Sequence, residues 1–212
     1  MDIAMCGRYT VLTEDEIIEI REILKDLSMR IVYDDFDNYD RQPGEVFPTN
    51  FAPIITKKDD GVAFESAKWG FKKWNSTGVI INARCETMNK KRTFSHLLKT
   101  GYCVVPAGEF FEWERLPEVK KKYYARDKSG NLLFMAGLYR DIGDKREYVI
   151  ITKQATGEMA KIHDRVPVLL RTDQLEGWLI GEISPDDIAD MEYHLSVTPC
   201  EDDDEQVQIS IY

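Results

Sequence analysis

The chain has 212 residues, of which 43% are hydrophobic and 31% charged, proportions typical of a soluble globular domain large enough for one core. It contains no run of about 18 apolar residues that would span a bilayer, and its first residues lack the basic and apolar regions of a secretory signal. Taken alone, the formal net charge of −10 argues against a nucleic-acid partner. We therefore expect one cytoplasmic domain over residues 1–212, without contact to a membrane.

The basic residues gather in the middle of the chain. From Lys68 to Lys128 there are 14 Lys and Arg against 6 Asp and Glu, although the whole chain is acidic. Acidic runs occupy residues 34–37 and a second loop at about residues 200–206. This distribution permits either an ordinary solvated surface or a track for phosphates in the central segment.

The first helix and the strands that follow it are marked by their residue patterns. Thr13 to Glu16 form a capping box, and the apolar residues after it have helical spacing. Short runs rich in β-branched and aromatic residues then predict strands. These strands are expected at residues 51–56, 62–69, 79–83, 102–106, 109–114, 121–127, 132–139, 147–153 and 166–170.

Further helices are expected at residues 92–99, 156–162 and 172–180, and after Ser184, where Pro185 suits the first helical turn. Most of the strands are joined by short turns rather than by crossover helices. The pattern therefore predicts an α+β single domain with a largely antiparallel, curved, barrel-like β core and peripheral helices.

The four cysteines (Cys6, Cys85, Cys103 and Cys200) lie far apart, without a Cys-x-x-Cys pair or a His at ligand spacing. This argues against zinc and against a disulfide framework, so we expect reduced thiols, no metal and no cofactor.

Cys6 differs from the others because it follows Met5. If translation starts at Met5 and that Met is removed, Cys6 carries a free α-amine beside its thiol, and these two nucleophiles can condense with an aldehyde. An internal cysteine cannot react in this way because its nitrogen belongs to an amide. Residues 1–4 are then a leader that is removed or is not native. The plainer interpretation is a buried small hydrophobe.

Two segments place polar side chains at the ends of apolar strands. Asn82 and Arg84 share one face if the strand extends through them, so both can contact one ligand. Alternatively, Asn82 satisfies a turn and Arg84 pairs with Glu86. Glu112 lies between aromatic residues, a setting that favours the neutral carboxyl and suits proton transfer near neutral pH. It lies in water if Phe111 and Trp113 face the core instead.

His163 is one of three histidines, and it stands beside Asp164, Arg165 and a proline. Imidazole titrates in the physiological range, although a lone histidine is usually structural.

Five motifs occur in one order along the chain: Met5-Cys6-Gly7-Arg8-Tyr9, Trp69-Gly70-Phe71, residues 82–87 (Asn-Ala-Arg-Cys-Glu-Thr), residues 109–113 (Glu-Phe-Phe-Glu-Trp) and Ile162-His163-Asp164-Arg165. Together they resemble the SOS-response-associated peptidase (SRAP) family, the abasic-site processing proteins, over residues 5 to about 170. The resemblance implies a barrel-like domain with a groove for single-stranded DNA, which captures the aldehyde of an abasic site as a thiazolidine on an N-terminal cysteine. It implies no metal and no organic cofactor.

The resemblance also assigns roles to individual residues. Cys6 is the expected nucleophile, Asn82 orients it, Glu112 is an acid or base, and His163 donates the proton that helps to open the sugar ring. The expected DNA-binding residues are Arg8, Arg84, Arg92 and Arg165 at phosphates and Trp74 as a base-stacking wedge. The partner is single-stranded DNA with abasic sites, and the protein is expected to be a monomer.

Two alternatives remain open. A cysteine peptidase would use Cys6 and His163 on peptide bonds, including those of its own leader, and it needs a thiolate but no free α-amine. A reader of modified DNA would bind without covalent chemistry and would retain its binding without Cys6.

Overall fold

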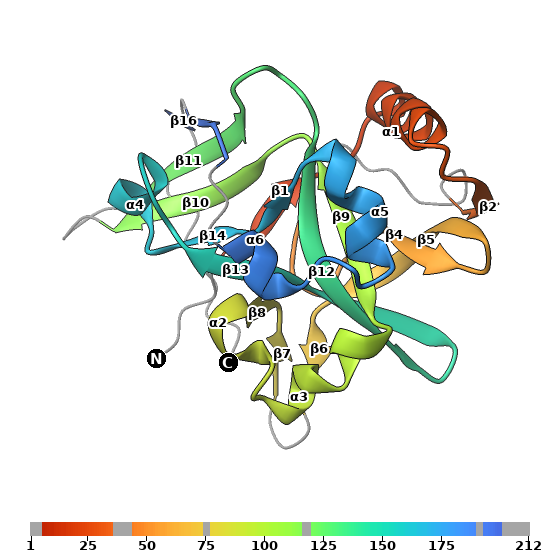
Figure 1. The fold of residues 1–212 in the computed structure, drawn as a ribbon. Coiled ribbons are helices and arrows are strands. Elements are labelled where there is room, and N and C mark those ends of the chain that lie inside the picture. The colour runs from red at the N-terminus through yellow and green to blue at the C-terminus, as the bar shows by residue number, and fades with distance from the viewer. Residues whose placement is uncertain (1–5, 36–43, 74–76, 116–119, 190–192, 201–212) are drawn as a thin grey trace.

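A computed structural model describes residues 6–35, 44–73, 77–115, 120–189 and 193–200. Its centre is a closed five-stranded β barrel (Figure 1). The barrel strands are β4 (Phe51–Lys58), β5 (Gly61–Trp69), β9 (Tyr102–Ala107), β12 (Leu133–Ile142) and β13 (Lys145–Gln154). In the barrel their order is β5, β4, β9, β12, β13. Neighbours along this order pair antiparallel, and the parallel pairing of Tyr148 with Trp69 closes the barrel between β13 and β5.

Short strands extend this barrel sheet. They are β2 (Ile31–Asp34), β8 (Asn82–Arg84), β14 (Arg165–Pro167) and β15 (Leu169–Leu170). Strand β8 runs parallel to β13, with Asn82 opposite Ile150, and β14 runs antiparallel to β13, with Arg165 opposite Gln154. The segments around Asn82 and Arg165 therefore lie on two sides of one barrel strand.

A second sheet has the strand order β16, β11, β10, β1, β3. Its strands are β1 (Arg8–Thr10), β3 (Glu45–Val46), β10 (Phe110–Arg115), β11 (Lys120–Asp127) and β16 (Leu195–Pro199), and β6 (Phe71–Lys72) and β7 (Val79–Ile80) form a separate pair. Arg8 is opposite Phe111, so the start of the described chain runs antiparallel beside β10.

The helices are short except for the first. They are α1 (Glu14–Asp26), α2 (Cys85–Met88), α3 (Arg92–Ser95), α4 (Met159–Ile162), α5 (Leu175–Leu179) and α6 (Pro185–Ala189), with 3₁₀ turns at Leu97–Lys99 and Thr172–Gln174. In Figure 1, α1 lies at the upper right and α4 at the left, beside β10 and β11. The capping box of α1 is present, because Thr13 Oγ1 accepts from Glu16 N–H and Glu16 Oε2 accepts from Thr13 N–H.

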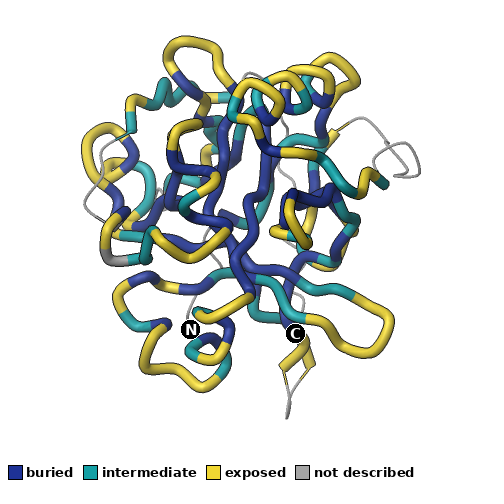
Figure 2. The backbone as a smooth tube through the Cα atoms, turned by 45° about the vertical axis from the view of Figure 1, so that its right-hand side comes forward, coloured by how far each residue is buried: buried dark blue, intermediate teal, exposed yellow. Residues whose placement is uncertain are grey.

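Two clusters of buried side chains hold these layers together. One joins the barrel to α1, α2 and α5, with Ile20, Phe64 and Trp178 among its members. The other joins the barrel to the second sheet and includes Cys6 and Trp69. Figure 2 shows the result, a buried middle with exposed loops around it. The predicted α+β domain with a largely antiparallel, barrel-like core is confirmed.

Some predicted elements are divided or shorter. The strand expected at 79–83 is interrupted at Ile81, whose carbonyl accepts from the Ile150 amide and from the Trp69 indole N–H. The strand expected at 166–170 is interrupted at Val168, where the chain passes from β13 to β12. The helix expected at 156–162 forms only over its last four residues.

Candidate functional site

Cys6 and Glu112 meet inside the protein. The Cys6 side chain is fully buried, Glu112 is 4% exposed, and the Cys6 backbone N–H donates to Glu112 Oε1 at 2.6 Å. The pairing of β1 with β10 brings them together across 106 positions of sequence. Cys6 has a positive φ of 43°, a conformation that costs free energy for a residue with a side chain. The N–H is therefore directed at a buried carboxylate.

The environment of Cys6 keeps its thiol protonated. Burial raises the pKa of the Cys6 thiol well above its ordinary value, and the nearby charge of Glu112 raises it further. Cysteine peptidases need the opposite condition, because the thiolate is their nucleophile.

Aromatic residues form the wall beside Cys6. Tyr9, Trp69 and Tyr148 belong to the same buried cluster as Cys6, and the hydroxyl groups of Tyr9 and Tyr148 form a hydrogen bond. The Trp69 ring lies 5.1 Å from the Tyr9 ring and 6.3 Å from the Tyr148 ring. Because Trp69 also donates to the carbonyl of Ile81, this wall fixes the backbone immediately before Asn82. Asn82 is half-buried, and its Oδ1 is shielded from solvent.

His163 follows α4, which packs against β10. The Arg165 backbone N–H donates to His163 Nδ1 at 3.1 Å, and an exposed carboxylate oxygen of Asp164 lies 3.0 Å from the same nitrogen. A nitrogen that accepts a hydrogen bond carries no proton, so the neutral ring in this arrangement holds its proton on Nε2. Met159 of α4 belongs to the same buried cluster as Cys6. His163 therefore lies directly after a helix that packs against the strand of Glu112.

The predicted arginines occupy different settings. Arg8 lies between aromatic rings, 4.4 Å from the Phe47 ring and 4.9 Å from that of Trp113, and it pairs with Glu45. Arg84 and Arg92 are exposed. Trp74 lies outside the described residues, as do the leader and residues 201–206.

Arg165 is buried rather than presented to solvent. Its guanidinium makes two hydrogen bonds with Glu86, at 2.5 and 2.8 Å, and a third with the Thr152 carbonyl at 2.6 Å. The sequence suggests Glu86 only as a partner for the neighbouring Arg84. The pair with Arg165 was missed because 79 positions separate the two residues, and only the adjacency of β8 and β14 to β13 brings them together.

The structure also shows a basic and aromatic surface around Arg8 that the sequence did not reveal. Lys122 packs on the rings of Phe111 and Trp113 and pairs with Glu45. Phe47 is 40% exposed. We call the group of Arg8, Phe47, Trp113 and Lys122 the cationic–aromatic surface; the buried ring of Phe111 lies beneath Lys122.

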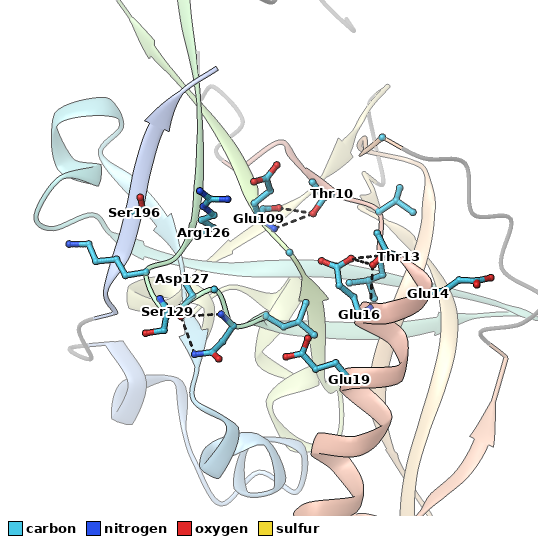
Figure 3. A pocket seen from close by; sticks show the side chains of 18 residues that line it. Thr10, Thr13, Glu14, Glu16, Glu19, Glu109, Arg126, Asp127, Ser129 and Ser196 are labelled. Carbon is cyan, nitrogen blue, oxygen red and sulfur yellow. Dashed lines mark hydrogen bonds between the residues drawn. The ribbon is translucent and has the colours of Figure 1, made fainter. Parts of the chain in front are cut away.

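A separate pocket of about 970 Å³ lies where α1 begins (Figure 3). Its lining includes Glu14, Glu16, Glu19, Glu109 and Asp127. Burial raises the pKa of Glu109, and Glu16 and Glu45 add to this shift against the opposing effect of Arg126. The pocket meets β1 and β10 at Thr10 and Glu109, away from Cys6 and Glu112. An acidic lining repels phosphates, so this pocket is a poor candidate for a DNA path.

Within the described residues, no group of three or more His, Cys, Asp or Glu side chains is arranged to hold a metal ion. None of the helices in that part of the chain is both long and apolar enough to cross a bilayer.

Comparison with known proteins points to one family. The sequence matches the family model described as SOS response associated peptidase (SRAP) over residues 5–208. Abasic site processing protein YoqW of Bacillus subtilis (strain 168) is 35% identical over 193 residues, covering 82% of this chain and 80% of the relative. Abasic site processing protein YedK of Escherichia coli (strain K12) is 27% identical over 191 residues, covering 85% and 82%.

Solved structures support the fold. A crystal structure of a Bacteroides thetaiotaomicron protein superposes with a TM-score of 0.73 at 21% identity, covering 92% of both chains. A second, from Bordetella bronchiseptica, gives a TM-score of 0.72 at 18% identity, covering 92% of this chain and all of the other. From the family match and the identity to its relatives, we conclude that this chain belongs to the SOS response associated peptidase family.

Proposed function

We propose that this protein processes abasic sites by binding single-stranded DNA and capturing the ring-opened aldehyde covalently on Cys6. The observation that carries this proposal is the hydrogen bond from Cys6 N to the buried Glu112 carboxylate. The names of the relatives YoqW and YedK point to the same lesion.

The chemistry requires Cys6 to be N-terminal. Its nitrogen is then an α-ammonium in equilibrium with the neutral amine, with an ordinary pKa near ~8. Glu112 accepts the ammonium proton, and the free amine attacks the aldehyde carbon to give a carbinolamine. Glu112 returns a proton to the hydroxyl group, which leaves as water and produces a Schiff base. The Cys6 sulfur then adds to the C=N carbon while its proton passes to the nitrogen, which closes the thiazolidine ring.

His163 and Asn82 serve the same reaction. With its proton on Nε2, His163 donates to the sugar-ring oxygen while the C1′–O4′ bond of the closed abasic deoxyribose breaks and the C1′ hydroxyl group loses its proton to water, which gives the aldehyde. Proton transfer by His163 also assists reversal. The amide of Asn82 orients the cysteine.

DNA binding is assigned to the cationic–aromatic surface together with Arg84 and Arg92. Single strands are bound by positive charge along the backbone and by aromatic surfaces for the bases, and this group offers both. The stacking role of Trp74 stays part of the proposal.

The leader must be removed for this chemistry. Either Met5 is the physiological start, or residues 1–5 are cleaved, by another peptidase or by the protein itself. A general cysteine peptidase is disfavoured because burial and Glu112 both raise the pKa of the Cys6 thiol. The reader of modified DNA is disfavoured by the buried pairing of Cys6 with Glu112, which binding alone does not need.

The test compares two forms of the protein that differ only at the N-terminus. One begins with Cys6. The other retains residues 1–5, so that the nitrogen of Cys6 belongs to a peptide bond. We expect only the first to form a heat-stable adduct with an oligonucleotide whose single uracil has been removed by uracil glycosylase. Equal adduct formation by both, or adducts with Cys6→Ala, would refute the proposal. Turnover of a peptide panel without adducts would favour the peptidase.

A further inference from the structure

The buried Arg165 side chain connects two of the sequence motifs. Glu86 belongs to the motif of Asn82 and Arg84, and Arg165 closes the motif that contains His163. Both carboxylate oxygens of Glu86 accept from the Arg165 guanidinium, at 2.5 and 2.8 Å, and Glu86 Oε1 also accepts from the Gln154 backbone N–H at 3.2 Å. Glu86 therefore joins α2, β13 and β14 at one point.

Arg165 is held from several sides. Its side chain is 6% exposed, and the Nη2 group donates to the Thr152 carbonyl as well as to Glu86. Planar two-point pairing of this kind fixes direction as well as distance. The backbone of the same residue is held as well, because β14 pairs with β13 and Arg165 lies opposite Gln154.

The backbone of Arg165 acts directly on His163. Its N–H donates to Nδ1 at 3.1 Å, and this bond selects the tautomer with a proton on Nε2. The competing neighbour of Nδ1 is the Asp164 carboxylate, 3.0 Å away and 71% exposed. If the Arg165 N–H moves away, Nδ1 becomes free to carry a proton directed at Asp164, and the neutral ring then has no proton on Nε2.

We propose that Glu86 is a positioning residue that acts through Arg165 to hold His163 in the tautomer that presents its Nε2 proton. The inference rests on the proposed function for the role of that proton. It explains why a carboxylate stands between two segments that are expected to bind an anionic substrate.

The first test measures the tautomer by ¹H–¹⁵N NMR of the imidazole rings, using the full chain at a pH where the histidines are neutral. His96→Gln and His194→Gln assign the His163 signal. We expect His163 to be in the Nε2–H form in the wild type and to become a mixture with the Nδ1–H form in Glu86→Ala. Glu86→Gln should fall between them, because the amide oxygen still accepts from Arg165. An unchanged tautomer in Glu86→Ala would overturn the inference.

The second test measures the rate of adduct formation with saturating abasic DNA, below the melting transitions of all variants. We expect Glu86→Ala to be about 10-fold slower, with Glu176→Ala, an exposed glutamate on α5, as the matched control. Affinity for DNA with a tetrahydrofuran lesion, which cannot open to an aldehyde, should stay within about twofold. A Glu86→Ala rate equal to that of the control would contradict the inference. Absence of adducts in the wild type would instead refute the proposed function, and the tautomer measurement would still decide the inference.

Arg165→Lys tests the two-point pairing itself. Lys keeps the positive charge but cannot pair in a plane with both oxygens of Glu86, so we expect the His163 tautomer to shift as it does in Glu86→Ala. An unchanged tautomer in Arg165→Lys would overturn the inference.

Discussion

At the scale of single residues, the proposed reactivity of Cys6 depends on its nitrogen as much as on its sulfur. The sulfur is buried and protonated, which is a poor starting point for a thiolate enzyme. The nitrogen, by contrast, already faces a carboxylate at 2.6 Å. This asymmetry favours amine chemistry first and thiol addition second.

Glu112→Gln tests the acid–base role. The amide keeps an oxygen that accepts from Cys6 N but cannot take up a proton, so we expect adduct formation to slow by about 100-fold with little change in DNA affinity. Single-turnover kinetics on abasic DNA measures this rate. Glu114→Gln, on the same strand, is the control, and a Glu112→Gln rate near that of wild type would remove Glu112 from the reaction.

The cysteines should differ in reactivity. Cys6 and Cys103 are fully buried and burial raises the pKa of both thiols, whereas burial and then Glu86 raise the pKa of Cys85 to about 11. Cys200 is half-buried. In the form that retains residues 1–5, in which Cys6 is buried, we expect a thiol-specific disulfide reagent at pH 7.5 to modify Cys200 first, and the other three only after unfolding. Fast modification of Cys6 in the folded protein, detected by peptide mass analysis, would contradict this environment.

At the scale of elements, sequence patterns predicted those parts of the fold that depend on local order. The capping box of α1 and the long barrel strands were predictable because their signals lie within a few residues. Strands β1 and β16 were not, because their few residues form strands only through pairing with distant partners.

The candidate site shows the same limit. The motifs named Cys6, Glu112 and His163, but the Glu86–Arg165 pair depends on how three strands assemble. The alternative in which Glu112 lies in water is wrong, because the carboxylate is buried and accepts a hydrogen bond from Cys6 N.

The Glu86–Arg165 connection should also contribute to stability in a pH-dependent way. Burial alone would raise the pKa of Glu86, but hydrogen bonds from Arg165 and from backbone N–H groups outweigh it and lower the pKa. A lowered folded-state pKa stabilises the fold above the unfolded value, near ~4.3, and this contribution is lost as the pH falls through the folded value.

In Glu86→Gln we therefore expect unfolding free energies to fall less steeply with acid than in the wild type over that window. The effect should be modest because the Glu86 side chain is 44% exposed. Urea unfolding at several pH values between about 3 and 6 measures it. Parallel curves for the two proteins would show that the pair contributes no pH-dependent stability.

At the scale of the whole molecule, acidic and basic side chains gather in two different regions. The lining of the pocket beside α1 has five carboxylates against two basic side chains, and the cationic–aromatic surface lies mainly on the second sheet. This separation reconciles a net charge of −10 with a DNA partner.

The salt dependence of DNA binding tests this arrangement. Arg84→Ala should weaken binding of single-stranded DNA and lower the salt slope by about one, because one phosphate contact is lost. Fluorescence anisotropy between about 50 and 200 mM salt measures the slope. Arg30→Ala, an exposed arginine paired with Asp60, is the control, and equal slopes for both variants would exclude Arg84 from the interface.

The most direct measurement is intact-mass spectrometry of the protein that begins with Cys6, after incubation with single-stranded DNA carrying one abasic site. We predict one protein–DNA species whose mass equals the sum of the two components minus one water, with fragmentation that places the DNA on Cys6. A protein that stays unmodified while it binds the same DNA, or an adduct on any other residue, would contradict covalent capture by the cysteine amine.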